Sequence, residues 1–422
     1  MPLELNPASP DFSSLIHPGA TLLWGQANAE PVTLTRALLA QRHDFKRLRI
    51  MLGIAGSDTC LPEHADAVDF FAYCGAGSNR ALADAGVLDI LPIHYSQMTQ
   101  MLRSGELHID VLMLQLSPAD AHGRHSLSLA NEYLVAALEH ATVVIGEVNR
   151  QAPWTYGERT LSLTDLDAVM YTDRSPLTSG SATIRAIDTQ IAWHIAQLVE
   201  DGSTLQTGIG AIPDAVLGAL TDHRNLGVHS GSIGDGVMRL MQNGVINNSR
   251  KTRDTGVSIG GILMGSQTLH QFAHRNDALQ LRSTSYTHDA QVLASLDRLV
   301  AINSAVEVDL SGQINSEAAA GSYLGAVGGA LDFMRGAQQS RGGLPVIALP
   351  SSAGAKSRIV PRLNGPVTIP RSDAGLIVTE HGVADLRGLT IKQRVRKMLD
   401  IASPQHQADL EQAWASGGIA GR

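Results

Sequence analysis

A glycine-rich turn at residues 208–212 is the clearest chemical feature of this sequence. The turn reads G-I-G-A-I, follows a short apolar run and precedes Pro213, where a helix would begin. Glycine lets the backbone turn sharply there and leaves N–H groups uncovered at the helix start. Such groups suit a developing oxyanion or a phosphate. Pro213 replaces the third glycine of a dinucleotide fingerprint, and a plain packing turn remains the alternative.

A second glycine cluster, followed by basic residues, predicts a place for a long phosphorylated ligand. Gly325, Gly328 and Gly329 precede a helical pattern, and Lys356 and Arg358 follow after the next apolar run. Two cations in a flexible loop beside bare glycine backbone are what a polyphosphate or a pantetheine arm requires. The alternative is a pair of connecting loops whose basic residues are simply solvated.

Two loops in the first half of the chain carry residues that suit a carboxylic acid. Arg80 and His94 follow predicted strands, and either side chain would hold the second carboxylate of a dicarboxylate such as succinate or itaconate. For Arg80 the alternative is an ion pair with Asp84, one turn along a helix.

Bulk composition describes a globular protein with more than one core. The chain has 422 residues, 44% of them hydrophobic and 17% charged, so two domains are expected. The net charge of -8 argues against nucleic acid as a partner. Cys60 and Cys74 lack a metal-binding spacing, and the sixteen histidines show no paired metal motif, so no metal is predicted. Residues 1–14 do not resemble a signal peptide, and no apolar run approaches the roughly 20 residues of a membrane span, so a cytoplasmic location is expected.

Short apolar runs alternate with helical patterns, which predicts an α/β fold with buried parallel strands. Strands are predicted at Thr21–Trp24, Val111–Leu116, Ala141–Val148, Arg298–Ile302, Pro345–Leu349 and Ala374–Val378. Helices are predicted at Leu34–Ala40, Glu132–His140, Ala186–Glu200 and Gln291–Leu296. The segment from Ala152 to Ile184 has no sustained period, so it separates two α/β domains, residues 1–184 and 185–422.

Taken together, these segments resemble the acetyl-CoA hydrolase/transferase family, and within it the 4-hydroxybutyrate CoA-transferases and class I CoA-transferases. The matching segments are Gly146–Gly157, Gly208–Leu217, Leu226–Lys251, Gly312–Leu363 and Val378–Gly388. They cover most of the chain in the family's order. The resemblance implies two related open α/β domains, an active site in the cleft between them, and commonly a homodimer.

The resemblance also implies acyl-CoA as a substrate and assigns residues to it, with no cofactor held permanently. The residues at the thioester oxygen would be Gly208, Ile209, Gly210, Ala211 and Ile212, with Gly210 contributing to catalysis. Gly328, Gly329 and Lys356 would hold the CoA arm.

One position departs from the family pattern. Family members use a glutamate as covalent nucleophile, in a segment similar to H-T-E-M-I-S-D-G. The matching stretch here is H-S-G-S-I-G-D-G, residues 229–236, so Gly231 occupies the catalytic position without a side chain.

Three explanations of this departure are open. A carboxylate from another loop, Glu63 or otherwise Glu30, would replace the missing nucleophile, because both follow predicted strand ends. The enzyme would otherwise hydrolyse thioesters with a carboxylate that directs water. The third reading is an inactive acyl-CoA-binding relative. We expect an acyl-CoA:carboxylate CoA-transferase before a hydrolase, and a hydrolase before an inactive binder.

Overall fold

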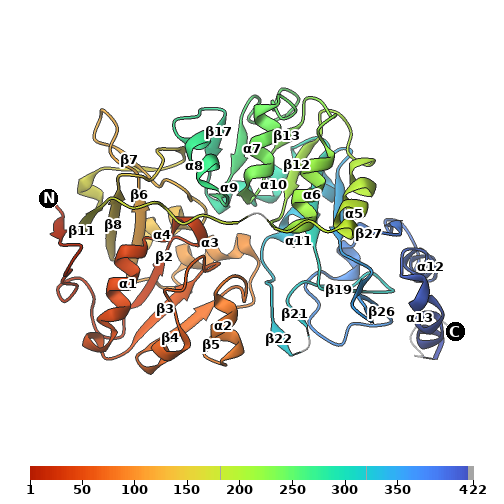
Figure 1. The fold of residues 1–422 in the computed structure, drawn as a ribbon, viewed down its shortest axis with the longest axis horizontal. Coiled ribbons are helices and arrows are strands. Elements are labelled where there is room, and N and C mark those ends of the chain that lie inside the picture. The colour runs from red at the N-terminus through yellow and green to blue at the C-terminus, as the bar shows by residue number, and fades with distance from the viewer. Residues whose placement is uncertain (181, 320, 417–422) are drawn as a thin grey trace. The chain divides into compact units, whose positions relative to one another are not determined.

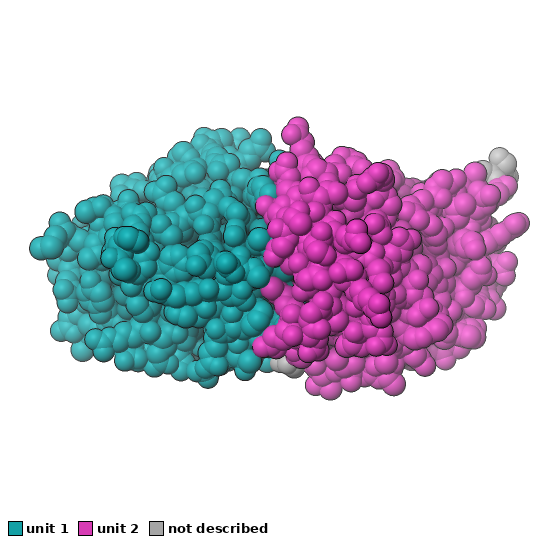
Figure 2. All heavy atoms as spheres, turned by 90° about the horizontal axis from the view of Figure 1, so that it is seen from above, with its two compact units in different colours: residues 1–180, 231–238, 257–289 teal, residues 181–230, 239–256, 290–422 magenta. Residues whose placement is uncertain are grey.

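The computed structural model describes residues 1–180, 182–319 and 321–416. These residues form two compact units, coloured separately in Figure 2. Unit 1 comprises residues 1–180, 231–238 and 257–289, and unit 2 comprises residues 181–230, 239–256 and 290–422. Within the described residues, no helix has both the length and the apolar character needed to cross a membrane.

Unit 1 is built on an eight-stranded sheet in which all neighbouring strands are parallel (Figure 1). In sheet order the strands are β1 (Leu3–Leu5), β11 (Ala168–Thr172), β8 (Val143–Asn149), β6 (Val111–Leu116), β2 (Thr21–Trp24), β3 (Leu48–Leu52), β4 (Val68–Ala72) and β5 (Leu88–Ile90). Every residue of β6 is buried, as expected of a central strand covered on both faces.

Short strands and helices complete unit 1. The small sheets pair β7 (His125–Ser126) with β10 (Thr160–Leu161), β14 (Ser232–Ile233) with β16 (Ile262–Leu263), and β17 (Leu279–Leu281) with both β9 (Tyr156–Gly157) and β15 (Ser258–Gly260). The helices are α1 (Val32–Ala40), α2 (Asn79–Asp84), α3 (Tyr95–Ser104), α4 (Leu134–His140), α8 (Gln267–Ala273) and α9 (Thr284–Thr287), with 3-10 turns η1 (Ala27–Ala29), η2 (Arg42–Phe45), η3 (Pro62–Asp66) and η4 (Leu163–Asp165). Helix α3 packs against both α4 and α9.

Unit 2 has a six-stranded sheet that is parallel except for its last pair. Its order is β13 (Gly227–Val228), β12 (Thr204–Thr207), β18 (Leu299–Ser304), β23 (Leu344–Ala348), β27 (Leu376–Thr379) and the antiparallel β28 (Gly382–Asp385). The smaller strands are β19 (Glu307–Asp309), β20 (Ile314–Asn315), β21 (Ala318–Ala319), β22 (Ser322–Tyr323), β24 (Ser352–Ala353), β25 (Lys356–Ser357) and β26 (Ile359–Val360).

The helices of unit 2 pack on its sheet or form the C-terminal part of the chain. They are α5 (Ala186–Ala196), α6 (Ala211–Ala219), α10 (Ala290–Ala294), α11 (Ala330–Gln339), α12 (Ile391–Asp400), α13 (Pro404–Ser416) and the 3-10 turn η5 (Arg371–Asp373). Helix α7 (Asp235–Gln242) starts in unit 1 and ends in unit 2. The α/β class with parallel sheets is confirmed.

The predicted strands correspond to real ones, two of them residue for residue. β2 and β6 begin and end as predicted, and the other four predicted strands overlap β8, β18, β23 and β27. The helix predicted from Glu132 begins instead at Leu134, because Glu132 has a φ of 25°, outside helical geometry.

The units do not follow a single division of the chain at residue 184. Residues 257–289 belong to unit 1 because β17 pairs with β9 and α9 packs on α3. The segment that contains Gly231 also belongs to unit 1.

Candidate active site

The G-I-G-A-I turn joins β12 to α6 in unit 2. Gly210 is the N-terminal cap of α6 with a φ of 118°, a conformation that favours glycine. The Asp214 N–H donates to the Gly210 carbonyl oxygen (3.0 Å), which closes the first helical turn. Earlier N–H groups of the helix, those of Ala211 and Ile212, have no acceptor within the helix. The turn therefore has the uncovered backbone donors that an oxyanion requires.

The second glycine cluster leads into α11 of unit 2. Gly328 has a φ of 56°, and Gly329 is the N-terminal cap of the helix. Lys356 is exposed at the start of β25, beside the turn of the short β24–β25 hairpin. Arg358 is half-buried, and in the described part of the chain its guanidinium has no hydrogen bond or ion pair. Burial, with the nearby Arg185 guanidinium, lowers the pKa of Arg358, so this region of unit 2 would gain from a bound anion.

Gly231 lies in unit 1, immediately before β14. Its carbonyl oxygen accepts from the N–H groups of Gly261 (2.9 Å) and Ile262 (3.1 Å). A Cβ placed on Gly261 would lie 2.9 Å from this same oxygen and 3.5 Å from Cβ of Glu132. Position 231 is thus separated from the Glu132 side chain only by the Gly261 backbone.

Glu132 is the most heavily buried carboxylate near Gly231, with an exposure of 1%. Its Oε2 atom accepts hydrogen bonds from Tyr95 Oη (2.6 Å) and from Gln26 Nε2 (2.7 Å). Its Oε1 atom is buried and has no hydrogen-bond partner in the described part of the chain. The two oxygens of one carboxylate are therefore held very differently.

The hydrogen bonds around Glu132 fix which group donates and which group accepts in each pair. Gln26 Oε1 accepts from the Ile54 N–H (2.7 Å) and from Tyr73 Oη (2.7 Å), which identifies it as the amide oxygen. Gln26 Nε2 then donates to Tyr95 Oη (2.9 Å) as well as to Glu132. Since Tyr95 accepts from Gln26, its own proton goes to Glu132. Both donors reach Oε2, so a proton carried by Glu132 sits on Oε1.

The elements around this network follow the ordinary geometry of a parallel sheet. Gln26, Gly53 and Tyr73 come directly after the carboxyl ends of β2, β3 and β4, which are neighbours in the sheet. Tyr95 begins α3, in the connection that follows the next strand, β5. Ligands of open α/β sheets bind at this edge, and the Glu132 network occupies it.

Electrostatics make Glu132 unusual for an acid. Burial raises the pKa of Glu132 to about 7, although the hydrogen bonds from Tyr95 and Gln26 lower it. Burial also raises the pKa of Tyr73 and Tyr95 well above their usual range, so both phenols stay protonated donors at neutral pH. Glu132 can therefore gain or lose a proton near neutrality.

The backbone that carries Glu132 is strained. Its φ of 25° and the φ of 57° at Ser128 fall in the left-handed region in one buried loop. Bridges to Ile262 through Ala130 and to Ser283 hold this loop in place. Left-handed non-glycine residues cost about 1–3 kcal/mol each and gather at functional sites.

Glu63, predicted as the replacement nucleophile, lies elsewhere in unit 1. It is exposed on η3, among surface residues that include Arg42 and His64. Its role stays a prediction to which the described geometry adds no support.

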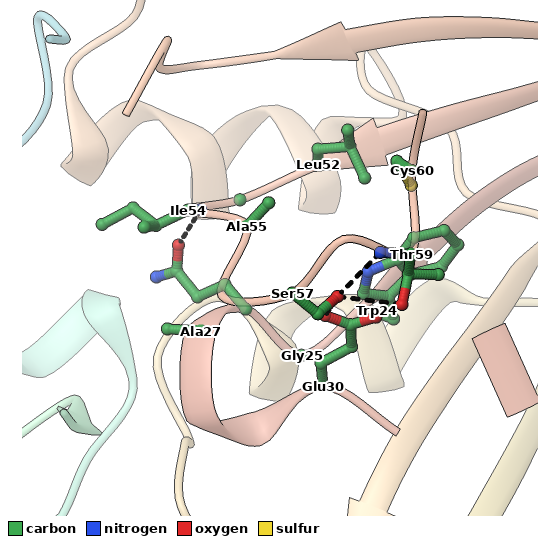
Figure 3. A pocket seen from close by; sticks show the side chains of 12 residues that line it. Trp24, Gly25, Ala27, Glu30, Leu52, Ile54, Ala55, Ser57, Thr59 and Cys60 are labelled. Atoms are coloured by element: carbon green, nitrogen blue, oxygen red, sulfur yellow. Dashed lines mark hydrogen bonds between the residues drawn. The ribbon is translucent and has the colours of Figure 1, made fainter. Parts of the chain in front are cut away.

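Glu30, the second predicted replacement, is buried but engaged. Its carboxylate accepts from Thr35 Oγ1 (2.9 Å) and Ser57 Oγ (2.7 Å). Figure 3 shows it in a cavity that Trp24, Thr59 and other residues line. The volume of about 10 Å³ is the space of one water molecule, too small for a thioester.

Arg80 and His94, predicted to bind the acceptor acid, lie on neighbouring elements of unit 1. Arg80 is in α2, where its Nε lies 3.6 Å from Asp84 Oδ2, so the predicted alternative ion pair is present. His94 is the N-terminal cap of α3, and its N–H donates to Gln97 Oε1 (3.0 Å). Tyr95, the next residue, contacts Glu132 directly.

Glu132 was missed because the sequence placed it in an ordinary helix. Its one local signal is an acid inside the apolar stretch L-S-L-A-N-E-Y-L-V-A-A-L, residues 127–138. Charged residues are almost never fully buried without a partner, so an acid in such a stretch indicates a special position.

Comparison with known proteins identifies the class of enzymes to which these parallel α/β units belong. The model described as "Acetyl-CoA hydrolase/transferase N-terminal domain" matches residues 8–178, and the corresponding C-terminal domain matches residues 265–414. The chain belongs to the acetyl-CoA hydrolase/transferase family and is an enzyme.

Individual relatives match over nearly the whole chain. A 4-hydroxybutyrate coenzyme A transferase of Clostridium kluyveri is 36% identical over 403 residues, 94% of each chain. A succinyl-CoA:cyclohexane-1-carboxylate CoA transferase of Geobacter metallireducens is 32% identical over 96% of this chain and 93% of its own. The crystal structure of RipA from Yersinia pestis superposes with a TM-score of 0.92 at 32% identity, over 99% of this chain and 98% of that one.

Proposed function

We propose that this enzyme is an acyl-CoA:carboxylate CoA-transferase that moves CoA between small carboxylic acids. The observation that carries the proposal is the full-length similarity to the Clostridium kluyveri transferase, 36% identity over 94% of each chain. Acyl-CoA is then a substrate, and no permanently bound cofactor enters the reaction.

Two features of unit 2 support this proposal. Gly208, Ile209, Gly210, Ala211 and Ile212 are proposed to line the thioester site, where the N–H groups of Ala211 and Ile212 suit the thioester oxygen. The Gly208 N–H already donates to the Ile302 carbonyl oxygen (3.1 Å), so Gly208 would shape the turn and not act as a donor. Gly328, Gly329, Lys356 and the half-buried guanidinium of Arg358 suit the phosphates of CoA.

Thioester hydrolysis is the second candidate, favoured by one observation. A carboxylate with a pKa of about 7, such as that of Glu132, is suited to take a proton from water.

The test is CoA exchange between acyl-CoA donors and a panel of mono- and dicarboxylic acids. Transfer that depends on the acceptor supports the transferase. Release of free CoA at the same rate without an acceptor supports the hydrolase. Absence of both reactions over a broad panel would overturn the proposed function and favour an acyl-CoA-binding protein.

Gly210 gives a direct test of the turn in unit 2. Gly210→Ala places a Cβ in open space but at a φ of 118°, so its cost is backbone strain of about 1–3 kcal/mol. We expect weaker catalysis with acyl-CoA, by about tenfold. The matched control is Gly218→Ala in the exposed face of α6, where alanine favours the helix and activity should be unchanged. Equal behaviour of the two variants would argue against a role for the turn.

We further propose that the acceptor is a dicarboxylate such as succinate or itaconate, held by Arg80 or His94. The Arg80 side chain is 61% exposed and its ion pair with Asp84 is long, so it can exchange partners. An Arg80→Ala enzyme should lose its preference for dicarboxylates over monocarboxylates. An unchanged preference in both Arg80→Ala and His94→Ala would contradict the assignment.

The proposal includes a cytoplasmic homodimer. Sedimentation of the purified protein at micromolar concentration should give twice the 44.7 kDa of one chain. A monomer at that concentration would contradict it.

A further inference from the structure

Glu132 has no structural role that requires an acid. Its hydrogen-bond partners, Tyr95 and Gln26, both donate to Oε2, and an amide oxygen would accept from them equally well. A glutamine would avoid the desolvation cost of a buried carboxyl group. Burial of an acid here, on a strained backbone, therefore indicates a use for its second oxygen.

That second oxygen, Oε1, is the reactive end of the carboxylate. It accepts no hydrogen bond in the described part of the chain, whereas Oε2 accepts two. Hydrogen bonds withdraw charge from an oxygen, so the electron density of the ionised group is most available on Oε1. The fixed network holds the carboxylate in one orientation, which favours a reaction at one atom.

The surroundings of Glu132 also connect it with position 231. The resemblance predicts a nucleophilic glutamate at this position, which holds a glycine, and only the Gly261 backbone separates that glycine from the Glu132 side chain. Gly261, which has no side chain, lies between Cβ of Glu132 and the Gly231 carbonyl oxygen. In the described residues, Glu132 also lacks an ion-pair partner that would neutralise it.

We propose that Glu132 is the catalytic nucleophile and carries CoA during transfer. The inference rests on the proposed CoA-transferase function. Oε1 attacks the thioester carbon, the C–S bond breaks, and the thiolate of CoA leaves with the electron pair, which gives an anhydride between Glu132 and the acyl group. The thiolate then attacks the Glu132 carbonyl carbon and releases the first carboxylate, so that CoA is held as a glutamyl thioester.

The second half of the reaction runs these steps in reverse with the acceptor. The acceptor carboxylate attacks the glutamyl thioester, which releases the CoA thiolate and forms a second anhydride. The thiolate attacks the acceptor's acyl carbon, and Glu132 leaves as a carboxylate. No net proton, electron or water is consumed.

The experiment compares Glu132→Gln with Glu158→Gln. Glu158 accepts from the Ser283 N–H (2.8 Å), the residue that bridges to Glu132, but Glu158 is exposed. We expect Glu132→Gln to fold, to lose CoA transfer by at least about 10³-fold, and to retain no covalently bound CoA after acyl-CoA treatment and acid unfolding. The wild-type chain and Glu158→Gln should retain hydroxylamine-labile CoA and transfer rates within about threefold of each other.

Different failures have different meanings. A wild-type chain without exchange on any acid would remove the proposed function itself. Exchange that persists in folded Glu132→Gln would remove only the assignment of Glu132. If Glu132→Gln does not fold, Glu132→Asp decides, because it withdraws the carboxylate by one methylene. A loss of about 10²-fold with folding retained supports the nucleophile, and an unchanged rate overturns it.

Discussion

Two buried glutamates of unit 1, Glu147 and Glu132, have opposite surroundings. Glu147 is fully buried on β8, and the Arg174 guanidinium donates to its Oε1 (2.7 Å). Its further donors are the N–H groups of Thr33 and Leu34 and the hydroxyls of Thr33 and Thr172. Among the described residues, Glu132 has two donors, both on one oxygen, and no cation.

The difference shows what each acid does. Thr33 and Leu34 lie in the first turn of α1. Glu147 therefore links β8 to the N-terminus of α1 and to the Arg174 guanidinium, which is a structural role. Its charge is compensated and its oxygens are occupied. Glu132 has an uncompensated charge and a free oxygen, the features that distinguish reactive carboxylates from structural ones.

The largest expected difference between Glu132 and Glu147 comes from converting each acid to its amide. Glu132→Gln should lose at least about 10³-fold in transfer, and its unfolding free energy at neutral pH should not fall, because the amide avoids the desolvation cost of the buried carboxylate. Glu147→Gln should do the reverse, with about 2–3 kcal/mol lost because Arg174 keeps its charge without its partner. Rates per folded molecule and urea unfolding measure both effects. If only Glu147→Gln lost activity, Glu147 would be the catalytic acid and Glu132 would not.

Stability should also depend on pH through Glu132. Its pKa of about 7 in the folded chain lies above the ordinary value of 4.5, so the folded state holds a proton that the unfolded state has released. Wild-type stability relative to Glu132→Gln is therefore highest below about pH 4.5 and falls as pH rises through about 7. The total change is about 3 kcal/mol. Urea unfolding of both proteins at pH 5 and pH 8 tests this, and an equal difference at both pH values would contradict it.

Placing an acid at position 231 tests whether this position and Glu132 belong to the same site. Gly231 is not among the glycines with a left-handed φ, so a side chain there does not meet the backbone strain that such a φ imposes. In the Glu132→Gln background, Gly231→Glu should raise the residual transfer rate by about tenfold or more, because the new carboxylate enters beside the lost one. Gly218→Glu on α6 in the same background is the control. No gain in the double variant would argue against a shared site.

A smaller effect is expected from the hydrogen bond that Tyr95 makes to Oε2. Tyr95→Phe removes a stabilising bond to the ionised form, so the pKa of Glu132 should rise further, by about one unit. Transfer at pH 7 should fall by about fivefold, because the ionised fraction of Glu132 falls by that factor, and it should recover at higher pH. Tyr73→Phe, which acts only through Gln26, should shift the pH–rate profile less. Equal pH profiles for wild type and Tyr95→Phe would contradict the role of this network.

Local patterns predicted the sheets well but could not assemble the Glu132 network. The runs T-L-L-W and V-L-M-L-Q-L are strands because their own residues are apolar over the whole length. Gln26, Tyr95 and Glu132 meet only because strand order brings distant connections to one sheet edge. The sequence pattern also predicted that a helix starts at Glu132, because an apolar stretch gives no indication of a left-handed φ.

The same limit explains the choice of Glu63 from the sequence. It follows β3 closely in the chain, as a catalytic acid of an α/β sheet can, yet it ends on an exposed 3-10 turn. The resemblance predicts a carboxylate at position 231, where the sequence has a glycine. The position of Glu132 beside Gly261 could not be predicted from the sequence, because residues 132, 231 and 261 are brought together only by tertiary contacts.

Chemical marking of the attacking carboxylate tests the central claim most directly. The wild-type enzyme is incubated with acyl-CoA without acceptor, reduced with borohydride and digested, and the peptides that contain Glu132, Glu147, Glu30 and Glu63 are compared by mass spectrometry. Borohydride converts a glutamyl thioester into a stable alcohol. We predict this alcohol at Glu132, with Glu147 unmodified in the same digest. Reduction at another carboxylate, or turnover with no reduced residue, would contradict the account.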